Sequence, residues 1–191
     1  MSNFLFKEIC PDMWSDFEKL FGQKGACGGC WCQHWRMPNS AKEWENIKGR
    51  KAKAASKKLI LSGAMTGLLA YDGDIPVGWC SYGPREVYAR INMMKPYQRN
   101  DIEGVWCINC FFIDKNYRRK GLASEMLSAA VRFIKNRKIK IIEAYPTPLA
   151  KDGNKLPAAF SFTGPLKMFE DFGFRIIQRT SHSRPLVRMR V

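Results

Sequence analysis

The stretch Val105–Ala130 constrains the fold of this chain more than any other. Its first part, Val105–Ile113, is nearly all apolar and rich in β-branched and aromatic residues, which is typical of a strand buried on both faces. A basic segment, Arg118-Arg119-Lys120-Gly121, follows shortly afterwards. Apolar residues then recur at the spacing of one helix face: Leu122, Met126, Leu127, Ala130, Phe133 and Ile134. The sequence therefore predicts a buried strand, a cationic turn and an amphipathic helix.

The turn has the chemistry of an anion site. A helix N-terminus presents unpaired N–H groups and a partial positive charge, so it binds phosphate well. Gly121 has no Cβ, which allows a phosphate to approach the backbone closely. The alternative interpretation is a solvated basic turn that begins a structural helix.

The spacing Arg118-x-x-Gly121-x-Ala123 resembles the R/Q-x-x-G-x-G/A signature of the GNAT acetyltransferase superfamily. The order of predicted elements is similar to that family over nearly the whole chain, and Phe169–Phe174 (FEDFGF) resembles the end of its last helix. Two further segments, Cys30-Trp31-Cys32 and Gly78-Trp79-Cys80, resemble a subset of the family to which we can assign no substrate. The resemblance implies one α/β domain over residues 1–191, with a mixed central sheet of about seven strands flanked by about four helices.

The resemblance also implies acetyl-CoA as the acyl donor. Its pantetheine arm would lie along the backbone of Phe111, Phe112 and Ile113 as an added strand does, and an N–H near Phe112 or Ile113 would polarise the thioester carbonyl. Arg118 and Lys120 would add positive charge. The pyrophosphate would bind the backbone N–H groups of Arg119, Lys120, Gly121, Leu122, Ala123 and Ser124.

The general acid departs from the family pattern. Many members use a tyrosine in the last helix to protonate the leaving thiolate, and the matching residue here is Phe169, which has no proton to give. Tyr145, at the carboxyl end of a predicted strand over 140–144, is one replacement, and Tyr82 is another. The alternative for Tyr145 is ordinary packing before a proline.

The candidate general bases are Glu143 and Glu103. Glu143 lies within an apolar strand, where a carboxylate is costly unless it is paired or faces a cleft. Its alternative role is an ion pair with a neighbouring Arg or Lys, and for Glu103 the alternative is simple exposure. A chain of water molecules is a third way to remove the proton.

A cysteine-rich loop over 25–37 contains Cys27, Cys30, Cys32 and His34, which are residue types that bind zinc. No second pair of ligands lies nearby, and Cys107 and Cys110 are three apart on a strand, so we expect them on opposite faces. We therefore expect buried or substrate-facing thiols and no metal.

Four tryptophans accompany this loop and its neighbours: Trp31, Trp35, Trp44 and Trp79. They could bind a flat or cationic substrate, or simply fill a core. The seven cysteines, an odd number, favour reduced thiols in a cytoplasm. We find neither a targeting segment nor a membrane span.

The chain has 32 Lys and Arg residues against 17 Asp and Glu residues, a net charge of +15, which favours anionic partners. The lysine-rich segment Arg50–Lys58 is compatible with nucleic acid, but a solvated helix face is the more frequent explanation. Motifs of dinucleotide oxidoreductases, P-loop NTPases, serine hydrolases and zincins are missing. The sequence does not indicate an oligomeric state.

Other elements are predicted from local signals. They comprise a strand over 3–10, a helix from Pro11 to Gly22, one helix over 40–61, a hairpin of strands 67–71 and 77–82, a polar excursion over 85–101, a loop over 146–163, a helix from Thr163 to Gly173, and strands over 174–180 and 186–191.

These features together predict an N-acetyltransferase that moves an acetyl group from acetyl-CoA to the primary amine of a small molecule or peptide, by direct attack in a ternary complex. Two alternatives come from other classes. One is a non-catalytic module that binds CoA, and the other is a nucleic-acid-binding protein that uses the basic surface.

Overall fold

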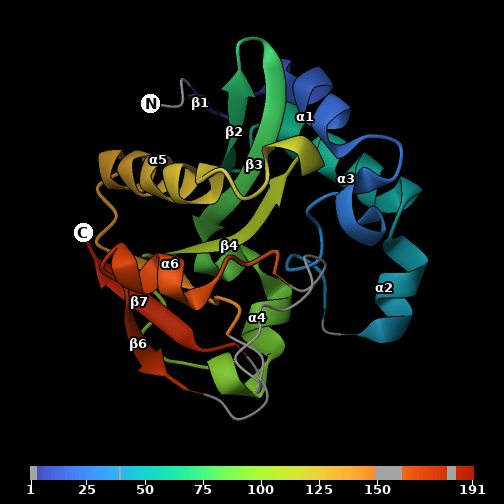
Figure 1. The fold of residues 1–191 in the computed structure, drawn as a ribbon. Helices are drawn as coiled ribbons and strands as arrows, with labels where there is room; N and C mark the ends of the chain where they lie inside the picture. Colours follow the sequence, from blue (N-terminus) through green and yellow to red (C-terminus); the bar gives the residue numbers. More distant parts are fainter. Residues whose placement is uncertain (1–3, 39, 149–160, 180–183) are drawn as a thin grey trace.

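The computed structural model describes residues 4–38, 40–148, 161–179 and 184–191, and one seven-stranded sheet runs through these residues (Figure 1). The strand order is β1-β2-β3-β4-β5-β7-β6, with β4 and β5 parallel and every other neighbouring pair antiparallel. The strands are β1 (Leu5–Glu8), β2 (Gly67–Asp72), β3 (Ile75–Pro84), β4 (Val105–Ile113), β5 (Ile141–Ala144), β6 (Arg175–Gln178) and β7 (Leu186–Arg190). The predicted mixed α/β sheet is therefore confirmed.

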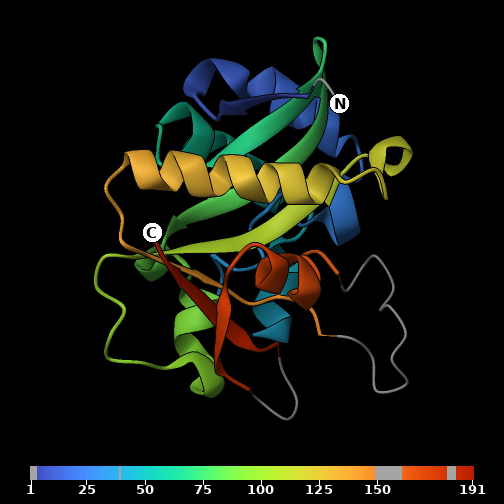
Figure 2. The ribbon, with the colours of Figure 1, turned by 60° about the vertical axis from the view of Figure 1, so that its left-hand side comes forward.

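Helices cover both faces of the sheet (Figures 1 and 2). Residues of one strand alternate between the two faces, so an apolar strand needs cover on both. Leu68 and Ala70 of β2 pack in one apolar cluster with α5, whereas Leu69 and Tyr71 pack in another with α1 and α3. The helices among the described residues are α1 (Trp14–Phe21), α2 (Ala41–Ile47), α3 (Arg50–Leu61), α4 (Ala89–Met93), α5 (Leu122–Asn136) and α6 (Leu166–Asp171).

Strand β4 carries a bulge at Asn109. Cys110 pairs with Ser81 and Ile108 pairs with Tyr82, so Asn109 has no partner in β3. The extra residue reverses the alternation of faces. Ile108 and Phe111 consequently share the α5 cluster, while Cys107 and Cys110 both lie in clusters of the opposite face. The prediction that these two cysteines point to opposite faces is wrong for this reason.

Beyond the bulge, β4 and β5 separate. Their parallel register runs from Val105 opposite Ile141 to Ile108 opposite Ala144. Past that point the Phe111 N–H donates instead to the Phe162 carbonyl at 2.6 Å. Thr147, which follows β5, forms a bridge with Pro165. The sheet is thus split next to the turn that precedes α5.

The helix predicted over 40–61 is two helices. Gly49 separates α2 from α3 with φ +81°, a conformation that favours glycine and interrupts the helix. Its N–H donates to the Gly29 carbonyl at 2.8 Å, which attaches this junction to the cysteine-rich loop. The predicted N-cap is confirmed, since the Ser40 Oγ accepts from the Glu43 N–H.

Smaller differences concern ends and connections. The polar excursion over 85–101 contains α4 and short 3-10 turns. Parts of the predicted strands over 3–10 and 174–180, and most of the predicted loop over 146–163, lie outside the described residues, as does His182. No helix in the described ranges is long and apolar enough to cross a membrane.

Candidate active site

Two neighbouring cavities lie beside the split in the sheet. The first, here called the β4–α5 cavity, has a volume of about 400 Å³. The second, here called the aromatic cavity, has a volume of about 430 Å³. They share five lining residues, which are Ala26, Cys27, Phe111, Phe112 and Phe162. A ligand that occupies one cavity therefore contacts the wall of the other.

The β4–α5 cavity contains half of the residues predicted to bind the donor. Phe111, Phe112, Ile113, Arg118 and Ala123 form one side of its lining. The opposite side comes mostly from a segment that the sequence analysis did not single out, comprising Ser161, Phe162, Gly164 and Pro165. The predicted donor residues are thus brought together along one cavity and the turn at its end.

The turn before α5 has the backbone shape that an anion site requires. Gly121 begins the helix with φ +83°, and Arg119 has φ +60°. The Ser124 N–H donates back to the Gly121 carbonyl at 2.9 Å, so this predicted donor is occupied. The N–H groups of residues 119–123 donate no hydrogen bond to a backbone carbonyl among the described residues, apart from bonds within regular helices and strands. Leu122 is buried, so only its backbone can face a ligand.

The arginine at the start of this turn is fixed against the strand. The Arg118 Nε donates to the Ile113 carbonyl at 2.9 Å, which ties the turn to the end of β4. Arg118, Arg119 and Lys120 are all exposed, so their charges lie at the surface next to the cavity. The Lys120 ammonium lies 5.3 Å from the centre of the Tyr117 ring.

 

The three predicted pantetheine contacts are not equivalent. Past the bulge, the backbone N–H and C=O groups of every second residue point toward β3. The Asp114 N–H, directly after β4, shows this direction, because it donates to the Val77 carbonyl at 2.9 Å. Phe112 pairs with Trp79 on that same edge. Phe111 and Ile113 face the split, but the Phe111 N–H already donates to Phe162. Ile113 is therefore the residue whose backbone edge is best placed along the β4–α5 cavity.

The aromatic cavity is built around His34. The imidazole makes edge-to-face contacts with three rings, at centroid distances of 5.1 Å to Trp35, 5.3 Å to Trp44 and 5.7 Å to Phe162. The Trp35 Nε1–H donates to the Asn109 carbonyl at 2.9 Å, so this ring is anchored on the β4 bulge. The cavity wall and the split in the sheet are thus parts of one arrangement.

The charged residues that line the aromatic cavity are basic. They are Lys48 and Arg184, and no Asp or Glu is among its described lining residues. The Arg184 Nε donates to the Thr163 Oγ1 at 2.9 Å, and its guanidinium lies 5.0 Å from the centre of the Phe162 ring. Burial, together with the charges of Arg90 and Arg184, lowers the pKa of His34 to about 4, so the imidazole is neutral at pH 7.

Four thiols line the same cavity: Cys27, Cys30, Cys32 and Cys110. The Trp79 Nε1–H donates to the Cys32 Sγ at 3.1 Å, so the two Trp-Cys segments of the sequence meet here. Hydrogen bonds from Cys110, Ser81 and Trp79 lower the pKa of Cys32 to about 7, against the effect of burial. Burial raises the pKa of Cys30 to about 11.

All seven cysteines are free thiols. Among the described residues, no group of three or more His, Cys, Asp or Glu side chains is arranged to hold a metal ion. Of the four thiols that line the aromatic cavity, Cys27 and Cys30 are at least partly exposed, whereas Cys32 and Cys110 are buried; contact of any of them with a substrate stays a prediction. The four tryptophans fall into two groups. Trp35 and Trp44 line the cavity, whereas Trp31 and Trp79 belong to the core under α1 and α3.

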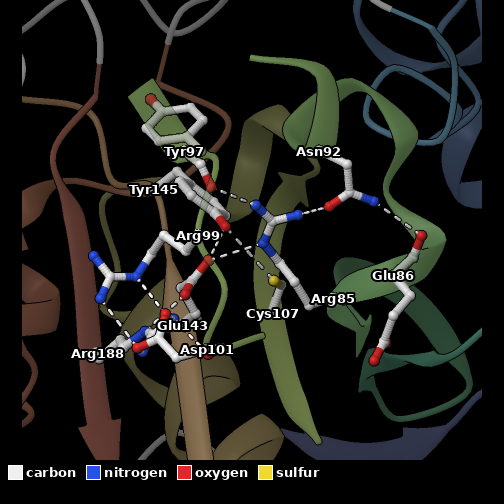
Figure 3. Close-up of polar contacts among 10 residues, drawn as sticks. All are labelled: Arg85, Glu86, Asn92, Tyr97, Arg99, Asp101, Cys107, Glu143, Tyr145 and Arg188. Carbon is white, nitrogen blue, oxygen red and sulfur yellow. Dashed lines mark hydrogen bonds and ion pairs between the residues drawn. The ribbon is translucent and has the colours of Figure 1, made fainter. Parts of the chain in front are cut away.

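Glu143, the first predicted general base, is a buried ion-pair partner (Figure 3). Its Oε1 accepts from the Arg85 Nε at 3.0 Å and its Oε2 accepts from the Arg188 Nε at 2.8 Å. The Tyr145 hydroxyl donates to the same carboxylate. The carboxylate has no exposed surface and lines neither cavity. These contacts correspond to the ion-pair alternative and leave no oxygen directed at an acceptor amine.

The tyrosine candidates are also placed away from the cavities. Tyr145 is fully buried between Glu143, Trp35 and Tyr97, and burial raises its pKa. The Tyr82 hydroxyl donates to Glu8, on the α5 side of the sheet. Phe169 is likewise buried in that cluster, and Glu103 is exposed. The predicted roles of Glu143 and Tyr145 in catalysis therefore lack geometric support.

Several cavity residues were not predicted as site residues, among them Phe162 and Arg184. Both lie in irregular segments, where no periodic pattern indicates which side chains point inward. For His34, the sequence pattern indicates only a possible metal ligand. The nearest available signal was the density of aromatic residues around the cysteine-rich loop.

Comparison with known proteins identifies the family. Residues 32–152 match the acetyltransferase (GNAT) family, a range that includes the split strand, the cationic turn and α5. The chain belongs to the GNAT family. No curated protein matches the sequence. The predicted resemblance is thus confirmed at the level of the family, and with it the expectation of an acetyltransferase.

Solved GNAT structures share the fold over most of their length. A PaiA N-acetyltransferase of Thermoplasma acidophilum, in complex with coenzyme A, has 11% identity, a TM-score of 0.55 and coverage of 99% of both chains. YhbS of Escherichia coli, also in complex with CoA, has 12% identity and a TM-score of 0.56, covering 100% of this chain and 82% of that one. A GNAT acetyltransferase of Streptococcus pneumoniae has 13% identity and a TM-score of 0.54, covering 99% and 100%.

Proposed function

We propose that this GNAT protein transfers an acetyl group from acetyl-CoA to a primary amine by direct attack in a ternary complex. The observation that carries the proposal is the shared wall of the two cavities, formed chiefly by Phe111, Phe112 and Phe162. One cavity ends at a cationic helix N-terminus and the other is enclosed by aromatic rings. Such a pair can hold a phosphorylated donor and an acceptor at the same time.

The donor would be held mainly by backbone groups. The N–H groups of residues 119–123, together with the charges of Arg118, Arg119 and Lys120, are suited to a pyrophosphate. The backbone edge at Ile113 is suited to the amide groups of a pantetheine arm. When bound, acetyl-CoA supplies a reactive thioester at the wall between the cavities. Complexes with CoA among the similar structures support this choice of donor.

The acceptor would need no single carboxylate base. Arg184 and Arg90 create a positive environment, and such an environment disfavours a protonated amine. The attacking amine loses one proton and the leaving thiolate gains one, so a direct or water-mediated transfer balances the reaction. This scheme is compatible with Phe169 at the position of the usual tyrosine, because the proton then comes from the amine itself.

Initial-rate kinetics test this proposal. We expect thiol release from acetyl-CoA that depends on an added amine, with double-reciprocal lines that intersect when both substrates are varied. Parallel lines would show an acetylated enzyme instead of a ternary complex. Acetyl-CoA binding with no amine-dependent thiol release across polyamines, amino acids, arylamines and lysine peptides would favour a non-catalytic CoA-binding module.

A further inference from the structure

The aromatic cavity has a chemistry that restricts the acceptor. Six phenylalanine and tryptophan rings contribute to its lining, from Phe21, Trp35, Trp44, Phe111, Phe112 and Phe162. Its volume of about 430 Å³ is large enough for one substituted ring. A flat apolar body would complement these walls, since aromatic pairs gain from edge-to-face and offset contacts.

The charges in the cavity are the second restriction. Lys48 and Arg184 line it and are both cationic. Lys48 pairs with Glu45 at the exposed surface, where solvent weakens the effect of both charges. Arg184 is more buried and lies against the Phe162 ring. A ligand with several positive charges would find no carboxylate among the described lining residues, whereas a ligand carboxylate would face the half-buried guanidinium of Arg184.

The pKa of His34 shows the combined effect of burial and positive charge in the aromatic cavity. It is surrounded by Trp35, Trp44 and Phe162, rings that would ordinarily favour a cation. The charged groups near it are Arg90, which donates from Nε to the His34 carbonyl at 2.8 Å, Arg184, and the Lys48–Glu45 pair at the rim of the cavity. Burial and the two arginines lower the pKa of His34. An ammonium group bound in the same cavity experiences the same two effects and loses its proton more readily.

On this basis, and resting on the proposed function, we propose that the aromatic cavity is the acceptor site and that it selects an aromatic amine bearing a carboxylate over a polyamine. The ring would occupy the space beside Trp44 and Phe162, and the carboxylate would lie toward Arg184. The amine, in its neutral form, would face the wall shared with the β4–α5 cavity.

Calorimetric titration tests the inference, with and without CoA. The probes are L-phenylalanine, L-tryptophan and 4-aminobenzoate, against phenethylamine, which lacks the carboxylate, L-alanine, which lacks the ring, and spermidine. We expect at least one aromatic amino acid or aminobenzoate to bind about tenfold or more tightly than its counterparts without ring or carboxylate. Spermidine binding more tightly than all three aromatic carboxylates, or none of the three binding, would overturn the inference.

Variants locate the site. Arg184→Gln should reduce the preference for phenylalanine over phenethylamine about tenfold, and Trp44→Leu should reduce the preference for phenylalanine over alanine. Lys42→Gln, which removes an exposed cation of α2 outside the cavity lining, is the matched control and should change neither preference. Unchanged preferences in both cavity variants, each shown to be folded, would contradict the assignment.

The inference and the proposed function fail differently. If acetyl-CoA neither binds nor releases thiol in the presence of any amine, the proposed function is wrong. If acetyl transfer to spermidine proceeds while the aromatic carboxylates are neither bound nor acetylated, the proposed function stands and the choice of acceptor is wrong.

Discussion

Glu143 demonstrates how one buried carboxylate can organise a large part of this molecule. It binds Arg85, where the excursion over 85–101 begins, and Arg188, which also binds Asp101 at the end of the excursion (Figure 3). The Arg85 Nη2 further donates to the Tyr97 carbonyl at 2.9 Å. We therefore regard Glu143 as the residue that fastens this excursion to β5 and β7.

A substitution of Glu143 should reduce stability first. Glu143→Ala leaves two arginines without their buried partner, and we expect the free energy of unfolding to fall by about 3–5 kcal/mol in urea titrations. Glu103→Ala is the control, because this carboxylate is exposed and should change stability by no more than about 0.5 kcal/mol. A Glu143→Ala protein of normal stability that lacks only catalytic turnover would restore Glu143 as a candidate base.

His34 gives a prediction about acid. Its pKa is about 4 in the folded protein and about 6.5 in the unfolded chain. Between these two pH values the unfolded chain binds more protons, so acidification favours unfolding. Stability should therefore fall as pH decreases from 6.5 to 4, by at most about 1.4 kcal/mol per pH unit from this residue.

Histidine resonances in NMR spectra measure this pKa directly, with His34→Gln used to assign the signal. The same variant should lose less stability than the unsubstituted protein between pH 6.5 and 4, because it lacks the titrating group. A His34 resonance that titrates near pH 6.5 would contradict the account of the aromatic cavity as a positive, desolvated environment.

At the scale of elements, the strand–turn–helix of Val105–Ala130 could be predicted because its signals are local. The bulge at Asn109 could not, since a strand that is apolar on both faces has no alternation to mark an extra residue. The ion-pair partners of Glu143 could not be predicted either, because Arg85 and Arg188 lie 58 and 45 residues away in the sequence. Phe162 and Arg184 lie in irregular segments that carry no periodic signal.

Gly49, at the junction of α2 and α3, gives a second prediction at the scale of elements. Its φ of +81° with ψ of −124° is a region that other residues avoid, while a Cβ there would meet no atom within 4 Å. Gly49→Ala should therefore reduce the free energy of unfolding by about 1–3 kcal/mol through backbone strain alone. Lys51→Ala, at an exposed site of α3, should change it by less than about 0.5 kcal/mol. Equal stabilities of the two variants in urea titrations would contradict this explanation.

At the scale of the whole molecule, some of the basic side chains behind the net charge of +15 pack against the core. The Lys53 and Lys57 ammonium groups of α3 lie 5.2 Å and 5.7 Å from the ring centres of Trp31 and Trp14. Lys53 also pairs with Glu18. These contacts give the lysine-rich helix a role in covering the core, and they favour the helix-face explanation over the nucleic-acid alternative.

The central claim is that the split between β4 and β5, closed at one end by the turn at Gly121, binds acetyl-CoA. Its most direct test is the thermal unfolding midpoint with and without acetyl-CoA for three proteins: the unsubstituted chain, Gly121→Asp, and Ser128→Asp. The last adds the same charge at an exposed position further along α5. Acetyl-CoA at 100 times its dissociation constant should stabilise the protein by about 2.7 kcal/mol, a shift of a few degrees. We predict this shift for the unsubstituted chain and Ser128→Asp, and its loss in a folded Gly121→Asp. An equal shift in all three proteins, or none in the unsubstituted chain, would contradict the claim.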